Sequence, residues 1–379
     1  MAVHNEKDKS KWTNDGRHWY FRTTYIDVNG KKKYYESKKY IDRETAEEEE
    51  RIFKAKICNP VTVKFSIVGD EYIEKLYSYK KESTAYTYEM DYKGKIRPYF
   101  ADFYISKVNN RLIKNWREEM EKKAYSLRYL NKLHGILVNI FDYAMKNYDL
   151  ESNIARQFGP FQRKKDDVIK DSEKLRYITY DEFKQFISVV NEDLWRCFFY
   201  TIYLTGARKG ELQALSWKDI SFDKSEITIN KTLSLKTHKE DYKITATKNY
   251  INRKIKMSKT LKEELLRYKK IVMQYKDFSE DWFVFGNTRF LPQTSIDRAK
   301  HKYFELSGVK NEITIHEFRH SHVSLLVSEY IKRNKTIDTA KFFLMLSNRM
   351  GHSIETMQRV YMHLFPTVQD EVVDILNEL

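Results

Sequence analysis

The segment 127-LRYLNKLHGILVNIFDYAMKNY-148 constrains the fold more strongly than the rest of the chain, because its apolar residues recur at helical spacing. Intervals of i, i+3 and i+4 place one apolar stripe along a long helix, and the stripe comprises Leu130, Leu133, Leu137, Ile140, Phe141 and Ala144. His134 lies one step off this stripe, which favours a packing or surface histidine over a metal ligand. Five prolines and 11 glycines in 379 residues indicate that helices dominate the whole chain.

A second helical pattern extends this region into an all-α domain at residues 61–157. Asn59-Pro60 interrupts the chain before it, and 67-IVGDEYIEKLYSYK-80 repeats apolar residues at helical spacing. Ser83 or Thr84 is expected to cap the helix that follows. Lysine and arginine side chains are expected on the outer faces of this domain.

The first 58 residues predict a small sheet followed by a helix. Apolar and polar residues are interleaved over 17–40 around an Asn29-Gly30 turn, and Asp42 or Thr45 is expected to cap a helix over 46–57. Residues 1–40 hold ten Lys/Arg against five Asp/Glu, whereas 41–58 hold four against six. A basic sheet backed by an acidic-faced helix suggests that the strands meet DNA, and a purely structural module is an equal alternative.

A charged segment at 158–171 is expected to link these parts to a domain at 172–379. Thr179 is expected to open a helix there, with Asp181 and Glu182 in its first turn. Apolar and polar residues alternate within 226–258, which predicts a small antiparallel sheet. The predicted fold class is therefore multidomain and mainly α, with small β-sheets.

The charge of the chain points to a polyanionic partner. Lys+Arg 69 against Asp+Glu 54 give a net charge of +15, and such a field favours nucleic acid over a solvated surface that binds nothing specific. The absence of any run of about 18 apolar residues predicts no membrane span, and the polar N-terminus predicts no secretory signal. Cys58 and Cys197 lie far apart and form no zinc or disulfide pattern, which is typical of a cytoplasmic protein.

One basic residue stands at a predicted helix start in 201-TIYLTGARKGELQALSWKDI-220. Thr205-Gly206 ends one helix and places Arg208 at the beginning of the next. A guanidinium there can face an anion together with backbone N–H groups.

A second basic stretch, 315-IHEFRHSHVSLL-326, holds three histidines and one arginine. His316 and Arg319 are three residues apart and are expected on one face of a helix. The metalloprotease spacings H-E-x-x-H and H-x-x-E-H do not occur in it. Phosphate recognition by this pair is therefore favoured over a metal site, with His320 and His322 interpreted as structural.

One of 28 tyrosines follows these stretches in 349-RMGHSIETMQRVYMHLF-365. Met350-Gly351-His352 predicts a turn into a helix, and Tyr361 would lie about two and a half turns later. A tyrosine hydroxyl can attack a phosphodiester and form a covalent phosphotyrosine. Two arginines can clamp the charge of the transition state without a metal, and a lysine or histidine can move the protons.

The boxes TGARKGEL, HEFRHSHVSLL and MGHSIETMQRVYMHL resemble the catalytic boxes of the tyrosine recombinases, the phage-integrase family, in order, spacing and flanking residues. The resemblance implies an α+β catalytic domain, no metal and no cofactor. Its implied site comprises the nucleophile Tyr361, the catalytic residues Arg208, Lys248, His316, Arg319 and His352, and the supporting Glu211. Lys248, in TATKNYINRKI, is the best match to the family's general acid, with Lys243 and Lys254 as competitors.

The resemblance also covers the other two parts of the chain. Residues 61–157 resemble the family's helical core-binding domain. Residues 1–58 resemble the arm-type DNA-binding domain, a three-stranded sheet plus helix, of integrases from phages and conjugative transposons. The candidate DNA contacts of this domain are Arg17, Arg22, Lys31, Lys32 and Lys33.

The implied function is site-specific integration and excision of a mobile element or prophage through a 3′-phosphotyrosine and a Holliday junction. The implied partners are core and arm-type sites on double-stranded DNA, three further copies of the chain in a tetramer, an excisionase and a host DNA-bending protein. A Xer-like resolvase or a type IB topoisomerase-like strand transferase is the alternative within this class. A non-catalytic DNA-binding protein and a metal hydrolase are the alternatives outside it. The amphipathic tail 366–379 is expected to dock on its own domain or on a neighbouring protomer.

Overall fold

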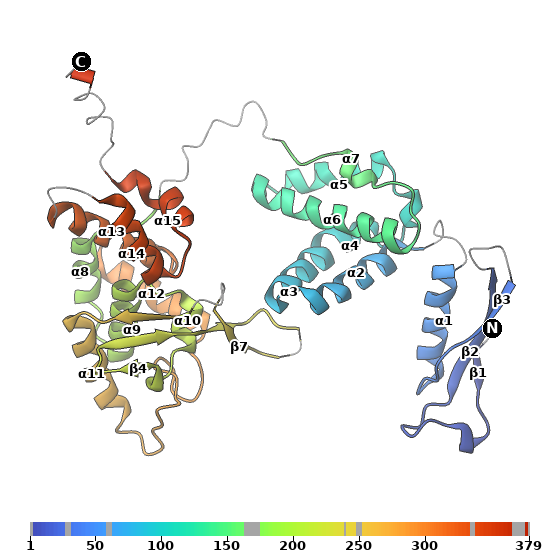
Figure 1. The fold of residues 1–379 in the computed structure, drawn as a ribbon, viewed down its shortest axis with the longest axis horizontal. Coiled ribbons are helices and arrows are strands. Elements are labelled where there is room, and N and C mark those ends of the chain that lie inside the picture. Colours follow the sequence, from blue (N-terminus) through green and yellow to red (C-terminus); the bar gives the residue numbers. More distant parts are fainter. Residues whose placement is uncertain are drawn as a thin grey trace. The chain divides into compact units, whose positions relative to one another are not determined.

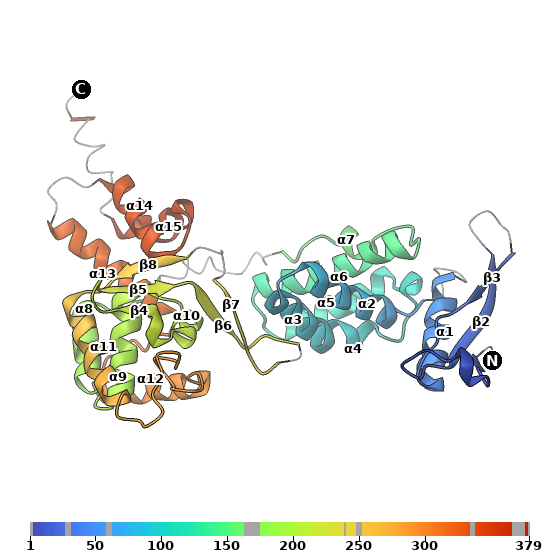
Figure 2. The ribbon, with the colours of Figure 1, turned by 60° about the horizontal axis from the view of Figure 1, so that its bottom comes forward.

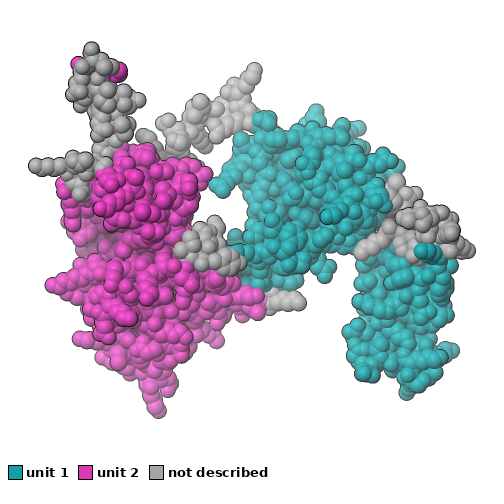
Figure 3. All heavy atoms as spheres, viewed as in Figure 1, with its two compact units in different colours: residues 1–168, 236–238 teal, residues 169–235, 239–379 magenta. Residues whose placement is uncertain are grey.

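The computed structural model describes residues 3–26, 32–57, 63–162, 175–238, 240–247, 252–333, 338–365 and 376–377. Most of these residues are helical, as Figure 1 shows. None of the helices in these ranges is both long enough and apolar enough to cross a lipid bilayer. The chain divides into two compact units, residues 1–168 with 236–238 and residues 169–235 with 239–379 (Figure 3).

Three small antiparallel sheets account for the strands of the described residues. The strands are β1 (Val3–Asn5), β2 (Trp19–Ile26), β3 (Lys32–Glu36), β4 (Ile220–Ser221), β5 (Glu226–Ile229), β6 (Lys231–Ser234), β7 (Lys243–Ala246) and β8 (Arg253–Lys256). They form sheets of order β1-β2-β3, β4-β5-β8 and β6-β7. The prediction of a mainly helical chain with small sheets is confirmed.

The helices fall into three groups along the chain. The N-terminal region has α1 (Arg43–Ile57). The helical region has α2 (Phe65–Tyr79), α3 (Glu82–Asp91), α4 (Arg97–Phe100), α5 (Asn110–Lys122), α6 (Leu127–Asn147) and α7 (Ile154–Gln157). The second unit has α8 (Tyr180–Ser188), α9 (Asp193–Thr205), α10 (Lys209–Ala214), α11 (Lys259–Val272), α12 (Gln293–Ser307), α13 (Glu317–Arg333), α14 (Thr339–Met350) and α15 (Ile354–Tyr361).

In the N-terminal region, α1 covers one face of the three-stranded sheet. Phe21 of β2 and Tyr35 of β3 pack against Phe53 of α1. Side chains alternate across a strand, so Arg22 lies on the opposite face. The expected turn at Asn29-Gly30 lies outside the described residues.

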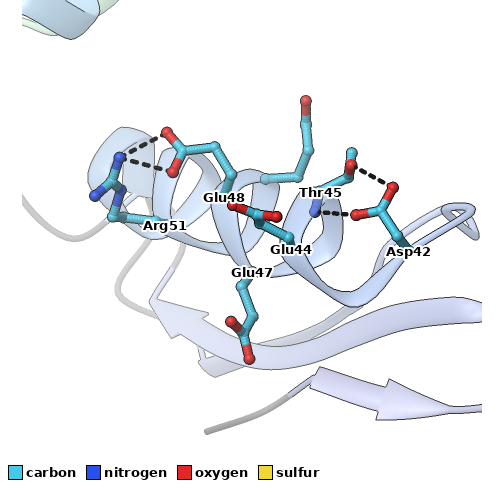
Figure 4. A pocket seen from close by; sticks show the side chains of 7 residues that line it. Asp42, Glu44, Thr45, Glu47, Glu48 and Arg51 are labelled. Carbon is cyan, nitrogen blue, oxygen red and sulfur yellow. Dashed lines mark hydrogen bonds and ion pairs between the residues drawn. The ribbon is translucent and has the colours of Figure 1, made fainter.

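The outer side of α1 is acidic, as the charge distribution of the sequence predicted. Asp42, rather than Thr45, caps the helix, since its carboxylate accepts a hydrogen bond from the Thr45 N–H at 2.7 Å. Glu44, Glu47 and Glu48 project along the same helix, where they line a pocket with Arg51 (Figure 4).

The helical region buries the apolar stripe of α6 in a core of its own. All six stripe residues are buried there, and the Ser126 side chain caps the helix. His134 is buried as well, so it is a packing residue. The predicted cap at Ser83 or Thr84 is wrong: α3 begins at Glu82, and both residues lie in its first turn. Phe161, from the segment expected to be a linker, is buried in this core.

The second unit surrounds the central helix α9, which packs against α8, α11 and α13. Thr179 and Glu182 form the capping box that starts α8, as expected. Ile227, Ile229 and Ile255 point from the β4-β5-β8 sheet into the main core. Figures 1 and 2 both show α13, α14 and α15 gathered at one side of this unit, and Tyr361 and Met350 belong to a smaller core between them.

Left-handed glycines end three helices of this unit, and Gly206 is the most crowded of them. Gly206 ends α9 with φ 64°, and Gly308 ends α12 with φ 67°. A β-carbon at Gly206 would lie 2.7 Å from His322 Cδ2 and 2.9 Å from Met350 Sδ, whereas one at Gly308 would meet its nearest atom at 3.8 Å. The α9–α10 turn therefore needs glycine for space as well as for backbone conformation.

We predict that Gly206→Ala destabilises the second unit more than Gly308→Ala. Both substitutions place a β-carbon in the left-handed region, at about 1–2 kcal/mol. Overpacking against His322 and Met350 adds about 1–3 kcal/mol to the first alone. Urea unfolding monitored by circular dichroism measures the difference, and equal midpoints for the two variants would contradict the crowding argument.

Candidate active site

A buried carboxylate joins two arginines at the start of α10. Arg208, the N-cap residue of α10, donates from Nη1 to Glu211 Oε1 at 2.9 Å and from its backbone N–H to Oε2 at 2.8 Å. Arg253 of β8 donates to both oxygens of the same carboxylate, at 3.0 and 2.6 Å. Glu211 therefore fixes a guanidinium from a helix start to one from a sheet strand.

The Glu211 side chain has no solvent exposure, and the neighbouring charges keep it ionised. Burial acts to raise its pKa, but hydrogen bonding and the positive charge of Arg253, aided by Arg208, outweigh burial and lower the pKa to about 2. The expected helix start at Arg208 is present. The Nη2 atom of Arg208 donates to the Gly351 carbonyl at 3.1 Å.

Arg319, in the first turn of α13, is held by two helix-end carbonyls. It donates from Nη1 to Gly206 O at 2.6 Å and from Nη2 to Met350 O. Only 2% of the residue is exposed, and burial followed by the charge of Arg208 lowers its pKa to about 9. Its guanidinium is still charged at neutral pH, so a buried positive charge stands beside the α9 and α14 ends.

His316 and His352 complete the set of residues expected from the second and third boxes. His316 immediately precedes α13, so the expectation that it lies on the helix with Arg319 is wrong, although its carbonyl accepts a hydrogen bond from the Arg319 N–H at 3.1 Å. His352 follows Gly351, whose carbonyl binds Arg208. Burial, then Arg319 and Arg208, lower the pKa of His352 to about 4, which makes its ring neutral at pH 7.

Tyr361 is the last residue of α15, an unbroken helix that Ser353 caps, as the turn at Gly351 predicted. The residue is 5% exposed, and burial raises the pKa of its hydroxyl to about 12 while Arg319 acts in the opposite direction. The hydroxyl lies 2.7 Å from His320 Nδ1 of α13. Tyr361 therefore packs in the smaller core while its buried oxygen contacts a histidine.

The structure separates His320 and His322, which the sequence alone predicts to be structural. His322 is fully buried: its Nδ1 donates to Tyr203 O at 2.8 Å, and its Nε2 accepts from Arg349 Nε at 3.0 Å. His322 therefore does connect α9, α13 and α14 as a packing residue. His320 instead contacts the predicted nucleophile.

The predicted lysine cannot be placed in this arrangement. Lys248 lies outside the described residues. Lys254 is exposed on β8, on the face opposite Arg253, and lies 3.9 Å from Glu226. Lys243 is exposed on β7. Lys248 and Lys243 therefore remain predictions, and the geometry disfavours Lys254.

Sequence reasoning missed Arg253 and His320. Arg253 carried a signal, because it occupies an inward position in the alternation that leads to Ile255 and Met257, where an arginine needs a buried partner. His320 stands four residues after His316, and the centroids of the two rings are 5.0 Å apart. Its contact with Tyr361 depends on how α13 packs against α15.

The assembled residues form a site suited to a phosphate. Two guanidiniums bind one carboxylate and a third, that of Arg319, binds only backbone carbonyls, so an anion that arrives finds uncompensated positive charge. His316, His320 and His352 add ring nitrogens that can donate or accept protons. Within the described ranges, no three His, Cys, Asp or Glu side chains gather so as to hold a metal ion.

Comparison with known proteins assigns the chain to a class. Residues 176–367 match the Phage integrase family, and residues 64–120 match the phage integrase N-terminal SAM-like domain. The ICEBs1 integrase of Bacillus subtilis (strain 168) is 30% identical over 294 residues, covering 75% of this chain and 74% of that protein. The integrase of Staphylococcus phage L54a is 25% identical over 300 residues, covering 73% and 81%.

Solved structures share the fold. The Tn1549 transposon integrase in complex with a circular intermediate DNA has a TM-score of 0.62 at 18% identity, covering 82% of this chain and 99% of that one. A λ integrase tetramer bound to a Holliday junction has a TM-score of 0.57 at 18% identity, covering 90% and 94%.

The chain belongs to the phage integrase family. It is a site-specific tyrosine recombinase, an enzyme that transfers DNA strands, and it resembles the integrases of mobile elements.

We predict that Glu211→Gln lowers the free energy of unfolding by about 3–5 kcal/mol near neutral pH, because it leaves the buried Arg253 and the partly buried Arg208 without their shared negative charge. The folded-state pKa of Glu211, about 2, lies below its ordinary 4.5. The carboxylate's stabilisation is therefore present above about pH 4.5 and is lost as the pH falls toward 2.

The difference in the free energy of unfolding between wild type and Glu211→Gln should therefore become smaller as the pH falls. Urea unfolding at a series of pH values tests this. Glu329→Gln, which alters an exposed pairing on α13 with Lys332 and Arg333, serves as the matched control and should change stability little at any pH. If the stability lost in Glu211→Gln instead increased below pH 4.5, the low pKa given to Glu211 would be refuted.

Proposed function

We propose that this recombinase integrates and excises a mobile element by cleaving DNA with Tyr361. The Tyr361 oxygen attacks a scissile phosphate, leaving a 3′-phosphotyrosine and a free 5′-hydroxyl. Arg208 and Arg319 bind the non-bridging oxygens, and His316 and His352 supply hydrogen bonds to them. Lys248, or Lys243 in its place, protonates the leaving 5′-oxygen.

The observation that carries this proposal is the convergence of the three boxes on a few helix-end carbonyls. Arg319 binds the carbonyls of Gly206 and Met350, and Arg208 binds that of Gly351. Both arginines thus come to the residue pair that precedes His352 and the tyrosine helix α15. Preorganised charge of this kind stabilises a phosphoryl transition state without reorganisation during the reaction.

The chemistry conserves the energy of the broken phosphodiester. A covalent phosphotyrosine retains a phosphate ester bond, so a 5′-hydroxyl from a second duplex can reverse the attack without ATP. Two such exchanges pass through a Holliday junction. The λ integrase tetramer bound to a Holliday junction, similar in fold, supports a tetramer for this chain as well.

The preceding parts of the chain are proposed to bind the DNA. Residues 61–157, of which 64–120 match the SAM-like domain, would hold the core site with the catalytic domain at 172–379. Residues 1–58 would bind arm-type sites, with an excisionase and a host DNA-bending protein as accessory partners in the bacterial cytoplasm. The C-terminal tail at 366–379 would regulate the tetramer, and apart from residues 376–377 it lies outside the described residues.

We predict that Tyr361→Phe abolishes the covalent DNA adduct and strand exchange, because the attacking oxygen is removed. Tyr203→Phe is the matched control: Tyr203 is also a buried tyrosine of the second unit, but its hydroxyl has no hydrogen-bond partner among the described residues. Denaturing gel electrophoresis of labelled DNA, which carries the joined ends of the element, detects the adduct. Wild type should form it in EDTA, and an adduct that survives in Tyr361→Phe would exclude this nucleophile.

The predicted arm contacts differ in their placement. Arg22 lies on the sheet face away from α1 and pairs with Glu36 at 2.7 Å. Lys33 is exposed but shares the strand face of Tyr35, which packs on α1. Arg17 pairs with Asp15 at 2.7 Å. Lys31 and the side chain of Lys32 lie outside the described part of the structure. Arg22 is thus the best-placed contact for DNA on the open sheet face.

We predict that Arg22→Gln weakens binding to the element's arm DNA. The slope of the logarithm of the binding constant against the logarithm of the salt concentration should fall in magnitude by about 1, as expected for one lost phosphate contact. Arg51→Gln is matched in charge and in its 2.7 Å pairing with a glutamate, but it lies on the acidic side of α1. Fluorescence anisotropy across a salt series should show an unchanged slope for Arg51→Gln. Equal losses in both variants would count against DNA binding by the open sheet face.

A further inference from the structure

The hydroxyl of Tyr361 has a specific partner that the proposed roles leave unused. His320 Nδ1 lies 2.7 Å from this oxygen, and the two side chains come from different helices, α13 and α15. The His320 ring is partly buried, and the ring centroids of the two residues are 5.7 Å apart. The contact is formed within one chain, so each subunit carries its own histidine and tyrosine together.

The protonation state of His320 determines whether it can accept a proton from Tyr361. Burial, followed by His316 and Arg319, lowers the pKa of His320 to about 4, against a weaker opposing effect of Glu317. The ring is therefore neutral at pH 7. With its hydrogen on Nε2, it presents the Nδ1 lone pair to the phenol hydrogen.

We propose that His320 is a catalytic residue that takes the proton of Tyr361 as the tyrosine oxygen bonds to phosphorus. The step rests on the proposed function, in which Tyr361 is the nucleophile. The O–P bond forms while the bond from phosphorus to the 5′-oxygen breaks. The phenol proton moves to Nδ1, and the leaving oxygen takes a different proton from the lysine ammonium assigned above.

The electrostatics of the site explain why the transfer waits for DNA. Before DNA binds, the high pKa of Tyr361 and the low pKa of His320 keep the proton on the phenol. A bound phosphate brings negative charge next to the ring, and an opposite charge stabilises an imidazolium. In the reverse step the same N–H returns its proton to the tyrosine oxygen when a 5′-hydroxyl attacks the phosphotyrosine.

Two substitutions separate proton transfer from simple positioning. In His320→Asn the amide oxygen takes the place of Nδ1, so it can accept the hydrogen bond of Tyr361 but not its proton. We expect His320→Asn and His320→Ala both to slow single-turnover cleavage about 10²–10⁴-fold in the full-length protein. His363→Ala, which alters an exposed histidine two residues after the nucleophile, should cleave at the wild-type rate. Wild-type cleavage by His320→Asn would overturn the proposal, and faster cleavage by His320→Ala would show an inhibitory contact instead.

Two chemical probes keep the test valid if a variant is poorly folded. Each probe asks how the cleavage defect of His320→Asn changes when the leaving group or the nucleophile is altered, and poor folding alone would leave that defect unchanged. A 5′-bridging phosphorothiolate has a sulfur leaving group that needs no proton, so the His320→Asn defect should persist on this DNA. A fluorinated tyrosine at position 361 has a more acidic hydroxyl, so the same defect should shrink. A defect that disappears on the phosphorothiolate, or that is unchanged with fluorotyrosine, would overturn the assignment.

The outcome for the nucleophile is read separately. An adduct that persists in Tyr361→Phe would refute the proposed function itself. Wild-type cleavage by His320→Asn together with an inactive Tyr361→Phe would refute only the role of His320.

Discussion

The shared carboxylate of Glu211 is the interaction on which the rest of the catalytic unit depends. Its two oxygens bind Arg208 from a helix start and Arg253 from a strand. The two guanidiniums repel each other, and the buried one of Arg253 has also lost most of its hydration, so the pair needs a buried negative partner in this position. Because Arg208 and Arg253 also bind the carbonyls of Gly351 and Arg349, the same carboxylate fixes the end of α14.

The positive field that remains has a second consequence, which concerns the histidines. Arg208, Arg253 and Arg319 carry three charges against one on Glu211, a difference of +2 in these four groups. Burial and this field keep His352 and His320 neutral. In the proposed mechanism, the arginines therefore provide the charge that binds a phosphate, whereas the histidines contribute hydrogen bonds and proton acceptors. These different roles follow from the protonation states at pH 7, where the guanidiniums are charged and the imidazole rings of His320 and His352 are neutral.

Several features of the site follow from local sequence, and these could be predicted. Thr205-Gly206 ends α9 and places Arg208 at the next helix start, and Gly351 followed by Ser353 fixes the beginning of the tyrosine helix. The periodicity of α6 and the mainly helical fold have the same local origin.

Features that depend on packing between distant segments could not be predicted in the same way. The sequence alone does not separate His320 from His322, because both stand on one helix, and only the packing of α15 on α13 distinguishes their partners. Lys81 rather than Ser83 or Thr84 precedes α3, and no side chain of the described residues caps that helix start, so capping preference is a poor guide there. Arg253 stands at an inward position of its strand, but its partner Glu211, 42 residues earlier in the chain, is known only from the fold.

The crowded glycines limit how this protein can change over generations. A methyl group at Gly206 would meet His322 and Met350, and one at Gly351 would lie 3.2 Å from Arg253 Nη1. Each glycine thus lies against side chains from distant parts of the chain, so a substitution at one position alters which residues are tolerated at another. Such epistasis means that single-box exchanges between related integrases should often fail where joint exchanges succeed. Chimaeric recombinases would have to inherit these contacts as a set.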